Sequence, residues 1–230
     1  MGFGGGSTYN ALLALAETDY RLLPIVALAC NLIVVTGGTI RFAAAGLMPW
    51  RRLWPILLLS APLAWAGGLT PISEALFKTL LGAALLVAAG LMFVRGSGRG
   101  DGNRRAPDWA GWPVGMGIGY LSGLVGIGGG IFLAPVLHLI RWDRAQPIAA
   151  SASTFILVNS LAGLAGQLMK QGGAGGVAAA AIGYWPLLLA VFVGGQLGTH
   201  LGVRILPERW IRLLTALLTA TVGARLLLGF

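Results

Sequence analysis

Charged residues are scarce in this chain of 230 residues. They make up 10% of it, while hydrophobic residues make up 57%, and an average soluble domain carries about a quarter charged residues. Charge this sparse does not cover the surface of a water-soluble globule. Apolar stretches recur instead, and about 20 apolar residues let a helix cross the hydrocarbon core of a membrane. They are Leu22–Ala45, Leu53–Gly68, Ala75–Val94, Trp112–Ile140, Ile148–Leu168, Val177–Leu201 and Ile211–Leu228. The composition predicts an all-α fold, a polytopic transmembrane helical bundle.

Cysteines and membrane-buried acids are also nearly absent. Cys30 is the single cysteine, which excludes an intrachain disulfide, and it lies in an apolar run as a small side chain would. All seven acidic residues fall in or beside loops. The chain has no HExxH motif, no pair of catalytic acids and no Cys/His cluster. We therefore expect no enzyme activity, no catalytic residues, no metal site and no cofactor.

The net charge of +9 comes from basic residues in short loops between the apolar stretches. That distribution is typical of the positive-inside rule of membrane proteins. A basic groove with interleaved aromatic residues, which nucleic-acid binding would favour, is missing. We expect the partners to be the lipid bilayer and a small anionic substrate, with a homodimer as one option, and no nucleic acid.

A glycine-rich phrase occurs twice. MGFGGGSTYN opens the chain, and VGIGGGIFLA returns in its second half. We call residues 2–6 the first glycine motif and Gly126–Gly130 the second. Further matches follow, such as Trp54-Pro55 with Trp185-Pro186. The chain therefore divides into a first transmembrane repeat over 1–95, a polar linker over 96–109 and a second transmembrane repeat over 110–230.

The loop charges indicate that the two repeats are inverted. Arg51 and Arg52 precede Trp54, whereas the equivalent loop of the second repeat reads GGAGG. Conversely, LTPIS in the first repeat has no base, while GVRILPERWIR in the second has several. Inverted repeats of this kind are common in secondary transporters. We expect an inner-membrane protein whose central linker is cytoplasmic.

Inversion requires that Gly111–Ile140 begin and end on one side of the membrane. This stretch of about 30 residues is long for one crossing and short for two. Its middle reads GIGGG, and each glycine inside a helix costs up to about 1 kcal/mol relative to alanine. We expect a broken or re-entrant pair of part-helices bent at Gly126–Gly130. A single tilted helix with close-packing glycines is the alternative.

The glycine motifs are candidate anion sites. A helix that starts after a glycine turn presents free N–H groups and the positive end of its dipole, and glycine lets a ligand approach that backbone closely. Two inverted motifs can then hold one small oxyanion between them. The alternative is close helix packing without any ligand. The candidate glycines are Gly4, Gly5, Gly6, Gly126, Gly128, Gly129 and Gly130.

Small polar side chains follow the motifs and complete the candidate site. They are Ser7, Asn31, Ser153, Thr154 and Asn159. Their hydroxyl and amide groups can hold an oxyanion, and interhelical hydrogen bonding is the alternative role. Three further residues are candidates for a proton or anion relay, with an interfacial or snorkelling role as the alternative. They are His138, His200 and Arg41.

The phrase GYLSGLVGIGGGIFLAPVLHL, followed by ASASTFILVNSLAGLAGQ, resembles the sulfite exporter permeases of the TauE/SafE family. The resemblance spans nearly the whole chain. It implies a bacterial inner-membrane permease that exports sulfite, sulfoacetate or a related organosulfonate by alternating access. The alternatives are a permease for another small anion and a channel-like or accessory membrane subunit without its own transport cycle.

This chain departs from the family pattern in two places. Relatives usually have an apolar segment before the first glycine motif, whereas this chain begins inside the motif at Met1, so we expect an N-terminally truncated first repeat, with a member that lacks this part-helix as the alternative. The first repeat also has Asn10-Ala11 where the second has Ala134-Pro135. Both departures concern the first half of the predicted site.

Overall fold

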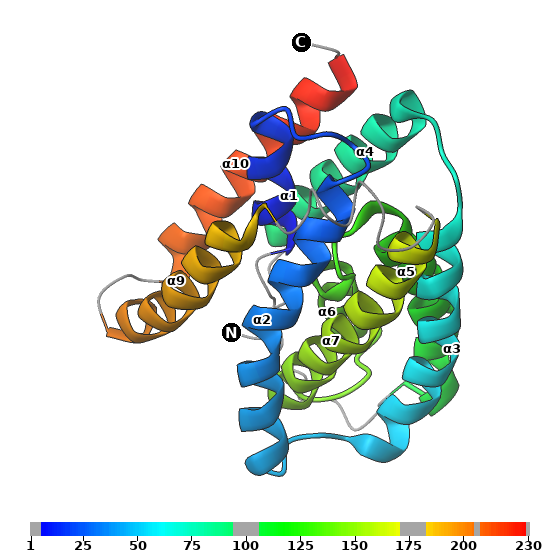
Figure 1. Ribbon diagram of the computed structural model, residues 1–230. Coiled ribbons are helices and arrows are strands. Elements are labelled where there is room, and N and C mark those ends of the chain that lie inside the picture. The colour runs from blue at the N-terminus through cyan, green and yellow to red at the C-terminus, as the bar shows by residue number, and fades with distance from the viewer. Residues whose placement is uncertain (1–5, 94–105, 171–182, 205–207, 229–230) are drawn as a thin grey trace.

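In a computed structural model of the chain, every described element is a helix (Figure 1). The structure describes residues 6–93, 106–170, 183–204 and 208–228, and it describes side chains over 6–91, 106–170, 183–195 and 213–228. The elements are α1 (Gly6–Leu15), α2 (Leu23–Ala44), α3 (Trp50–Leu69), α4 (Glu74–Phe93), a 3₁₀ turn η1 (Asp108–Gly111), α5 (Trp112–Val125), α6 (Gly130–Leu139), α7 (Ala145–Lys170), α9 (Trp185–Arg204) and α10 (Glu208–Leu228). The predicted all-α class is confirmed.

Four of the described helices are long and apolar enough to cross a membrane. They are α2, α3, the Glu74–Leu91 part of α4, and α7. Shorter apolar helices include α6, the Trp185–Gly195 part of α9 and the Leu213–Leu228 part of α10. Large apolar side chains such as Leu58 and Leu161 stand on the outside of the bundle. A continuous apolar exterior of this kind suits a lipid environment.

Two helices at equivalent positions of the predicted repeats have similar local structure. The helices α1 and α6 begin at the equivalent glycines Gly6 and Gly130, and each runs for 10 residues. Both end in the same turn, because Glu17 and Arg141 share a left-handed φ of 53°. The next N–H, in Thr18 or Trp142, then donates to the last turn of the helix at 3.1 or 2.9 Å. This is a Schellman-type ending in each repeat.

Equivalent helices of the two repeats also contact one another. Packing joins α2 with α7 and α4 with α10. The helices α2 and α7 run in opposite directions, because Gly38 meets Ser153 while Leu28 meets Gly163. Figure 1 shows the same crossing, with α2 descending and α7 rising. The domain boundaries and the inversion relative to a membrane stay predictions.

The helix α5 lies along α3 through a row of glycines. The contacts are, in order, Gly115 with Ile56, Gly119 with Ser60 and Gly123 with Ala64. An added Cβ at any of these glycines would collide with α3, so the absence of side chains is what allows the two helices to approach so closely. Because the order is the same on both helices, α3 and α5 are parallel.

The stretch Gly111–Ile140 forms a helical hairpin. Its first arm, α5, ends at Val125, and its second arm, α6, begins at Gly130. The open ends of the arms lie side by side, because the Ala106 N–H donates to the Arg141 carbonyl oxygen at 3.3 Å. The chain is therefore broken at the second glycine motif. How the hairpin sits in a bilayer stays a prediction.

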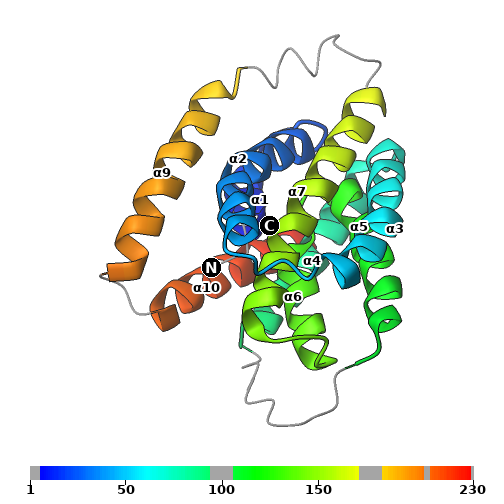
Figure 2. The ribbon, with the colours of Figure 1, turned by 90° about the horizontal axis from the view of Figure 1, so that it is seen from below.

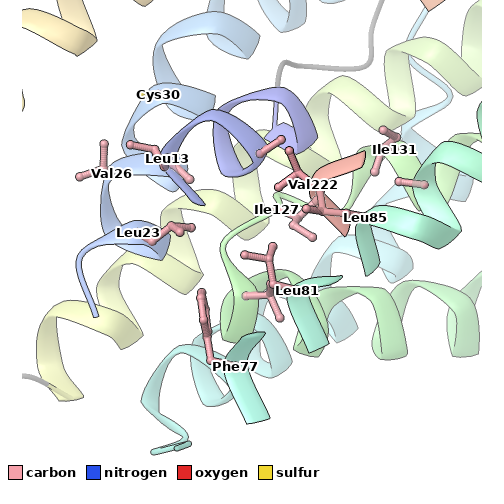
Figure 3. Packing of buried hydrophobic residues seen from close by; sticks show 14 of the residues in the cluster. Leu13, Leu23, Val26, Cys30, Phe77, Leu81, Leu85, Ile127, Ile131 and Val222 are labelled. Atoms are coloured by element: carbon pink, nitrogen blue, oxygen red, sulfur yellow. The ribbon is translucent and has the colours of Figure 1, made fainter. Parts of the chain in front are cut away.

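Two apolar clusters hold the second glycine motif between them. One joins α1, α2, α4 and α10 to Ile127 and Ile131, and Figure 3 shows its side chains converging around the motif. The other joins α3, α6 and α7 through residues such as Leu133 and Phe155. The helices α9 and α10 lie on the side away from α3 and α5 (Figures 1 and 2). The break between α5 and α6 is therefore central in the bundle.

Candidate functional site

The second glycine motif ends one helix and starts the next through left-handed backbone. Gly126 has a φ of 82°, Gly128 of 80° and Gly129 of 76°. Residues with a Cβ adopt this region at a cost of about 1–2 kcal/mol each, so three such positions within four residues strongly favour glycine. The Gly126 N–H donates to the Ser122 carbonyl oxygen at 2.9 Å and closes α5.

The start of α6 exposes several backbone donors. Within the described residues, the N–H groups of Gly128, Gly130 and Ile131 meet no backbone carbonyl. The first N–H groups of any helix lack a partner inside that helix, and the helix dipole adds a partial positive charge there. The second motif therefore presents the donor set that an anion needs.

The two glycine motifs meet. Gly6, the last residue of the first motif, lies so close to the Ile127 carbonyl oxygen that a Cβ at position 6 would collide with it. Asn10, one turn further along α1, donates from its Nδ2 to the Gly6 carbonyl oxygen at 2.8 Å and to that of Gly126 at 3.1 Å. The start of α1 and the end of α5 are thus joined by one amide side chain.

Asn31 lies at this junction with unused hydrogen-bonding capacity. Its side chain is fully buried, and among the residues that the structure describes neither its Nδ2 nor its Oδ1 has a hydrogen-bond partner. A Cβ on Gly128 would lie 2.7 Å from Asn31 Nδ2, and a Cβ on Gly6 would lie 3.2 Å from it. A buried amide without partners costs about 1–3 kcal/mol per unmade hydrogen bond. Asn31 therefore stands between both motifs as a donor without an acceptor.

Two serines extend this polar junction. The Ser160 hydroxyl of α7 would lie 3.2 Å from a Cβ on Gly128, and Ser122 of α5 faces Gly129. Both hydroxyls are buried and unpartnered. The sequence interpretation missed Asn10, Ser122 and Ser160. The helical spacing could have indicated two of these residues. Asn10 lies four residues after Gly6 and Ser122 lies four residues before Gly126, and residues four apart share one face of a helix.

The other predicted polar residues of α7 face elsewhere. Ser153 exchanges a hydrogen bond with Thr39 of α2 at 3.0 Å. Thr154 donates to the Ala150 carbonyl oxygen at 3.1 Å, and Asn159 Nδ2 donates to the Ser60 hydroxyl at 3.0 Å. These bonds are of the interhelical and intrahelical kind that polar side chains form in membrane bundles. Ser7 is buried at the start of α1.

The predicted relay residues lie at helix ends. Arg41 is exposed near the end of α2 and lines a cavity of about 30 Å³ against Val191 and Gly195 of α9. His138 is partly buried in the last turn of α6. His200 belongs to α9, but its side chain lies outside the described residues, as do Gly4 and Gly5 altogether. Neither Arg41 nor His138 reaches the junction of the motifs.

The described part of the chain contains no group of three or more His, Cys, Asp or Glu side chains that could hold a metal ion. The donors gathered at the motifs are N–H and O–H groups without a formal charge. That chemistry suits a weakly held anion.

Comparison with known proteins agrees with these features. A family model described as sulfite exporter TauE/SafE matches residues 1–226. A protein of Sinorhizobium fredii, y4hK, described as a probable membrane transporter protein, is 32% identical over 232 residues. That match covers 99% of this chain and 91% of the relative. No solved structure matches the chain significantly.

Proposed function

Because the chain belongs to the sulfite exporter TauE/SafE family, it is a multi-pass membrane transporter and not an enzyme, and we propose that its cargo is a small sulfur oxyanion held where the two glycine motifs meet. Sulfite, sulfoacetate and related sulfonates are the candidates. The observation that carries the proposal is the buried, unpartnered amide of Asn31 beside Gly6 and Gly128.

The donors at the junction fit an oxyanion better than a cation. The backbone N–H groups at the start of α6 and the Asn31 Nδ2 are donors, and the Ser122 and Ser160 hydroxyls can donate as well. A cation would instead use oxygens such as Asn10 Oδ1 and Asn31 Oδ1, which are also unpartnered among the described residues, but these amide oxygens carry no negative charge to balance it. No arginine or lysine in the described part of the chain reaches these groups, so the bound anion is released without breaking a buried ion pair.

The tight packing supports a transport cycle with moving parts. Side chains of α7, including Phe155 and Ile156, approach Gly129 and Gly130 so closely that no Cβ would fit. An anion therefore reaches the donors only when the hairpin shifts against α2 and α7. Alternating access between two inverted repeats supplies such a shift. We place the linker 96–109 in the cytoplasm of a bacterium, with the repeats in its inner membrane.

The test is anion flux into proteoliposomes, with substitutions at Asn31. We expect saturable sulfite flux in the natural protein. Asn31→Asp replaces a donor by a negative charge and should reduce the flux at least about tenfold, because charge repulsion and a lost hydrogen bond act together. Asn31→Ser keeps a donor of smaller reach and should retain measurable flux. Both variants are first compared by elution profile and melting temperature.

Each other outcome has a defined meaning. Flux in Asn31→Asp equal to that of the natural protein would show that the anion is not held at this junction. A thermal-shift response to acetate but not to sulfite, thiosulfate or sulfoacetate would assign a different anion. The absence of flux for all these anions under any gradient would indicate a channel-like or accessory subunit.

A further inference from the structure

One side chain holds both open ends of the α5–α6 hairpin. Arg52, in the first turn of α3, donates through Nη2 to the Ala106 carbonyl oxygen at 2.7 Å and through Nη1 to the Trp142 carbonyl oxygen. Ala106 precedes α5, and Trp142 follows α6. The arginine therefore fastens the entrance and the exit of the hairpin to a third helix.

Charge strengthens this attachment. Arg52 Nε lies 2.6 Å from Asp108 Oδ1, and Nη1 lies 3.7 Å from Asp143 Oδ2. The guanidinium also stacks over the Trp142 ring, 4.5 Å from its centroid. The Arg52 and Asp143 side chains are only 14% and 9% exposed, so solvent screens this pair less than it would screen a surface pair, whereas Asp108 is 61% exposed and its pair is screened more. The planar guanidinium offers its donors in a fixed fork that an ammonium group does not reproduce.

The remaining contact between the hairpin and α3 is made largely by glycines. Gly115, Gly119 and Gly123 of α5 lie directly against Ile56, Ser60 and Ala64 of α3, and at the far end of α3 the hydroxyls of Thr70 and Tyr120 share one hydrogen bond at 3.1 Å. Packed helices move past one another by small shear displacements. Arg52 and its partners are therefore the specific fixed point at this end of the α3–α5 interface.

We infer that Arg52 is a positioning residue, a latch that keeps the α5–α6 hairpin docked on α3 and so keeps the second glycine motif closed to the face on which Asp108 and Asp143 lie. This inference rests on the proposed transport function, because it describes how access to that site is controlled. When the latch opens, the hairpin slides along α3 and the donors around Gly128 become accessible from that one face.

Among the described residues, the positions equivalent to Arg52 and Asp143 form no such latch in the other repeat. If Trp54 corresponds to Trp185, the position equivalent to Arg52 is Gly183, which has no side chain to form such bonds. Asp19, the equivalent of Asp143, accepts a hydrogen bond from the backbone N–H of Arg21 at 2.9 Å. Access from the two faces is therefore controlled by different contacts.

The experiment measures thiol accessibility from each face separately. Cys30→Ala removes the single cysteine, and Ser160→Cys places a thiol beside Gly128. A membrane-impermeant methanethiosulfonate reagent is applied to vesicles of either orientation. Arg52→Gln should raise the labelling rate about tenfold from the face of Asp108 and leave the rate from the other face unchanged, since the lost contacts include charged hydrogen bonds. Arg51→Gln is the matched control, because Arg51 is its exposed neighbour, and it should change neither rate.

Two results would overturn the latch. Unchanged labelling in a folded Arg52→Gln protein would show that the contacts do not control access. Equal increases from both faces would show a structural role only. If Arg52→Gln does not fold, Arg52→Lys keeps the charge but loses the fork and should show a smaller increase from the same face; no increase in folded Arg52→Lys would then overturn the proposal.

This measurement uses no anion. Sided labelling in a protein without sulfite flux would support the latch and count against the proposed cargo. Sulfite flux without sided labelling would support the proposed cargo and count against the latch.

Discussion

Asn10 of α1 donates a hydrogen bond to the Gly126 carbonyl oxygen at 3.1 Å, and so ties the first repeat to the turn of the second. Both groups are buried in the bundle. In the second repeat, the position equivalent to Asn10 is Ala134, so the tie is made from one side only. The sequence difference between Asn10-Ala11 and Ala134-Pro135 thus has a structural role where the two motifs meet.

Asn10→Ala should destabilise the protein by about 1 kcal/mol, because it removes two hydrogen bonds and leaves the buried Gly126 carbonyl oxygen without this donor. The measurement is the melting temperature in detergent. Thr36→Ala is the control, since the Thr36 hydroxyl is exposed and bonds only to its own helix. Equal melting temperatures for Asn10→Ala and the natural protein would contradict the role given to Asn10.

Alanine substitutions at four glycines should separate backbone strain from steric collision. Gly117 is helical with open space around it, and Gly46 has a φ of 66° with open space. Gly123 is helical but faces the Ala64 backbone, and Gly128 combines a left-handed φ with close neighbours. We expect little loss at Gly117, about 1 kcal/mol at Gly46, about 2 kcal/mol at Gly123 and the largest loss at Gly128.

The readout for this series is the yield of folded protein and its melting temperature. A Gly128→Ala protein as stable as Gly117→Ala would show that the second glycine motif does not need its glycines. That result would also remove the reason for the break between α5 and α6.

Ser160→Ala and Ser153→Ala should have opposite effects. The Ser160 hydroxyl has no partner in the described part of the chain, so its loss should leave stability unchanged and weaken sulfite binding about tenfold, the value of one hydrogen bond to a charged group. Ser153 bonds to Thr39, so its loss should lower the melting temperature and leave binding unchanged. Binding is measured by sulfite titration. Weaker binding in Ser153→Ala with unchanged binding in Ser160→Ala would place the site closer to α2.

Single cysteines should report that both ends of the hairpin lie on one face of the membrane. In a Cys30→Ala background, Trp109→Cys and Arg141→Cys should be labelled by an impermeant reagent from the same side, because their neighbourhood is joined by the Ala106–Arg141 hydrogen bond. Glu17→Cys, at the equivalent turn of the first repeat, should be labelled from the other side. Labelling of Trp109→Cys and Arg141→Cys from opposite sides would exclude a hairpin.

The positions of the helices could be predicted from the sequence, because a long apolar run inside a membrane has few stable structures other than a helix. The run Leu22–Ala45 became α2 at Leu23–Ala44, and the glycines at 126–130 broke the helix where they were expected to. The start of α3 was placed too late, at Leu53. The helix begins at Trp50 and contains Pro55 within its second turn, where proline removes one backbone hydrogen bond of the helix.

The membership of the site could be predicted only in part. Asn31 was expected there and lies there, whereas Ser153, Thr154 and Asn159 point from α7 toward three different neighbours. A sequence shows which residues share a helix face, but it does not show which neighbour that face meets. For the same reason the sequence did not indicate Ser160. This residue follows Asn159 in the chain, but unlike Asn159 it contacts the second glycine motif.

The equal length of α1 and α6 has an electrical consequence. Ten helical residues span about 15 Å, and two such helices laid start to start span about 30 Å, the thickness of the hydrocarbon core. A charge held between them stands at a similar depth from both surfaces, so it senses about half of the transmembrane voltage whichever way it leaves. In the proposed transport cycle the electrical work for the two exits is therefore similar in size and opposite in sign, so an inside-negative potential favours the outward exit of an anion.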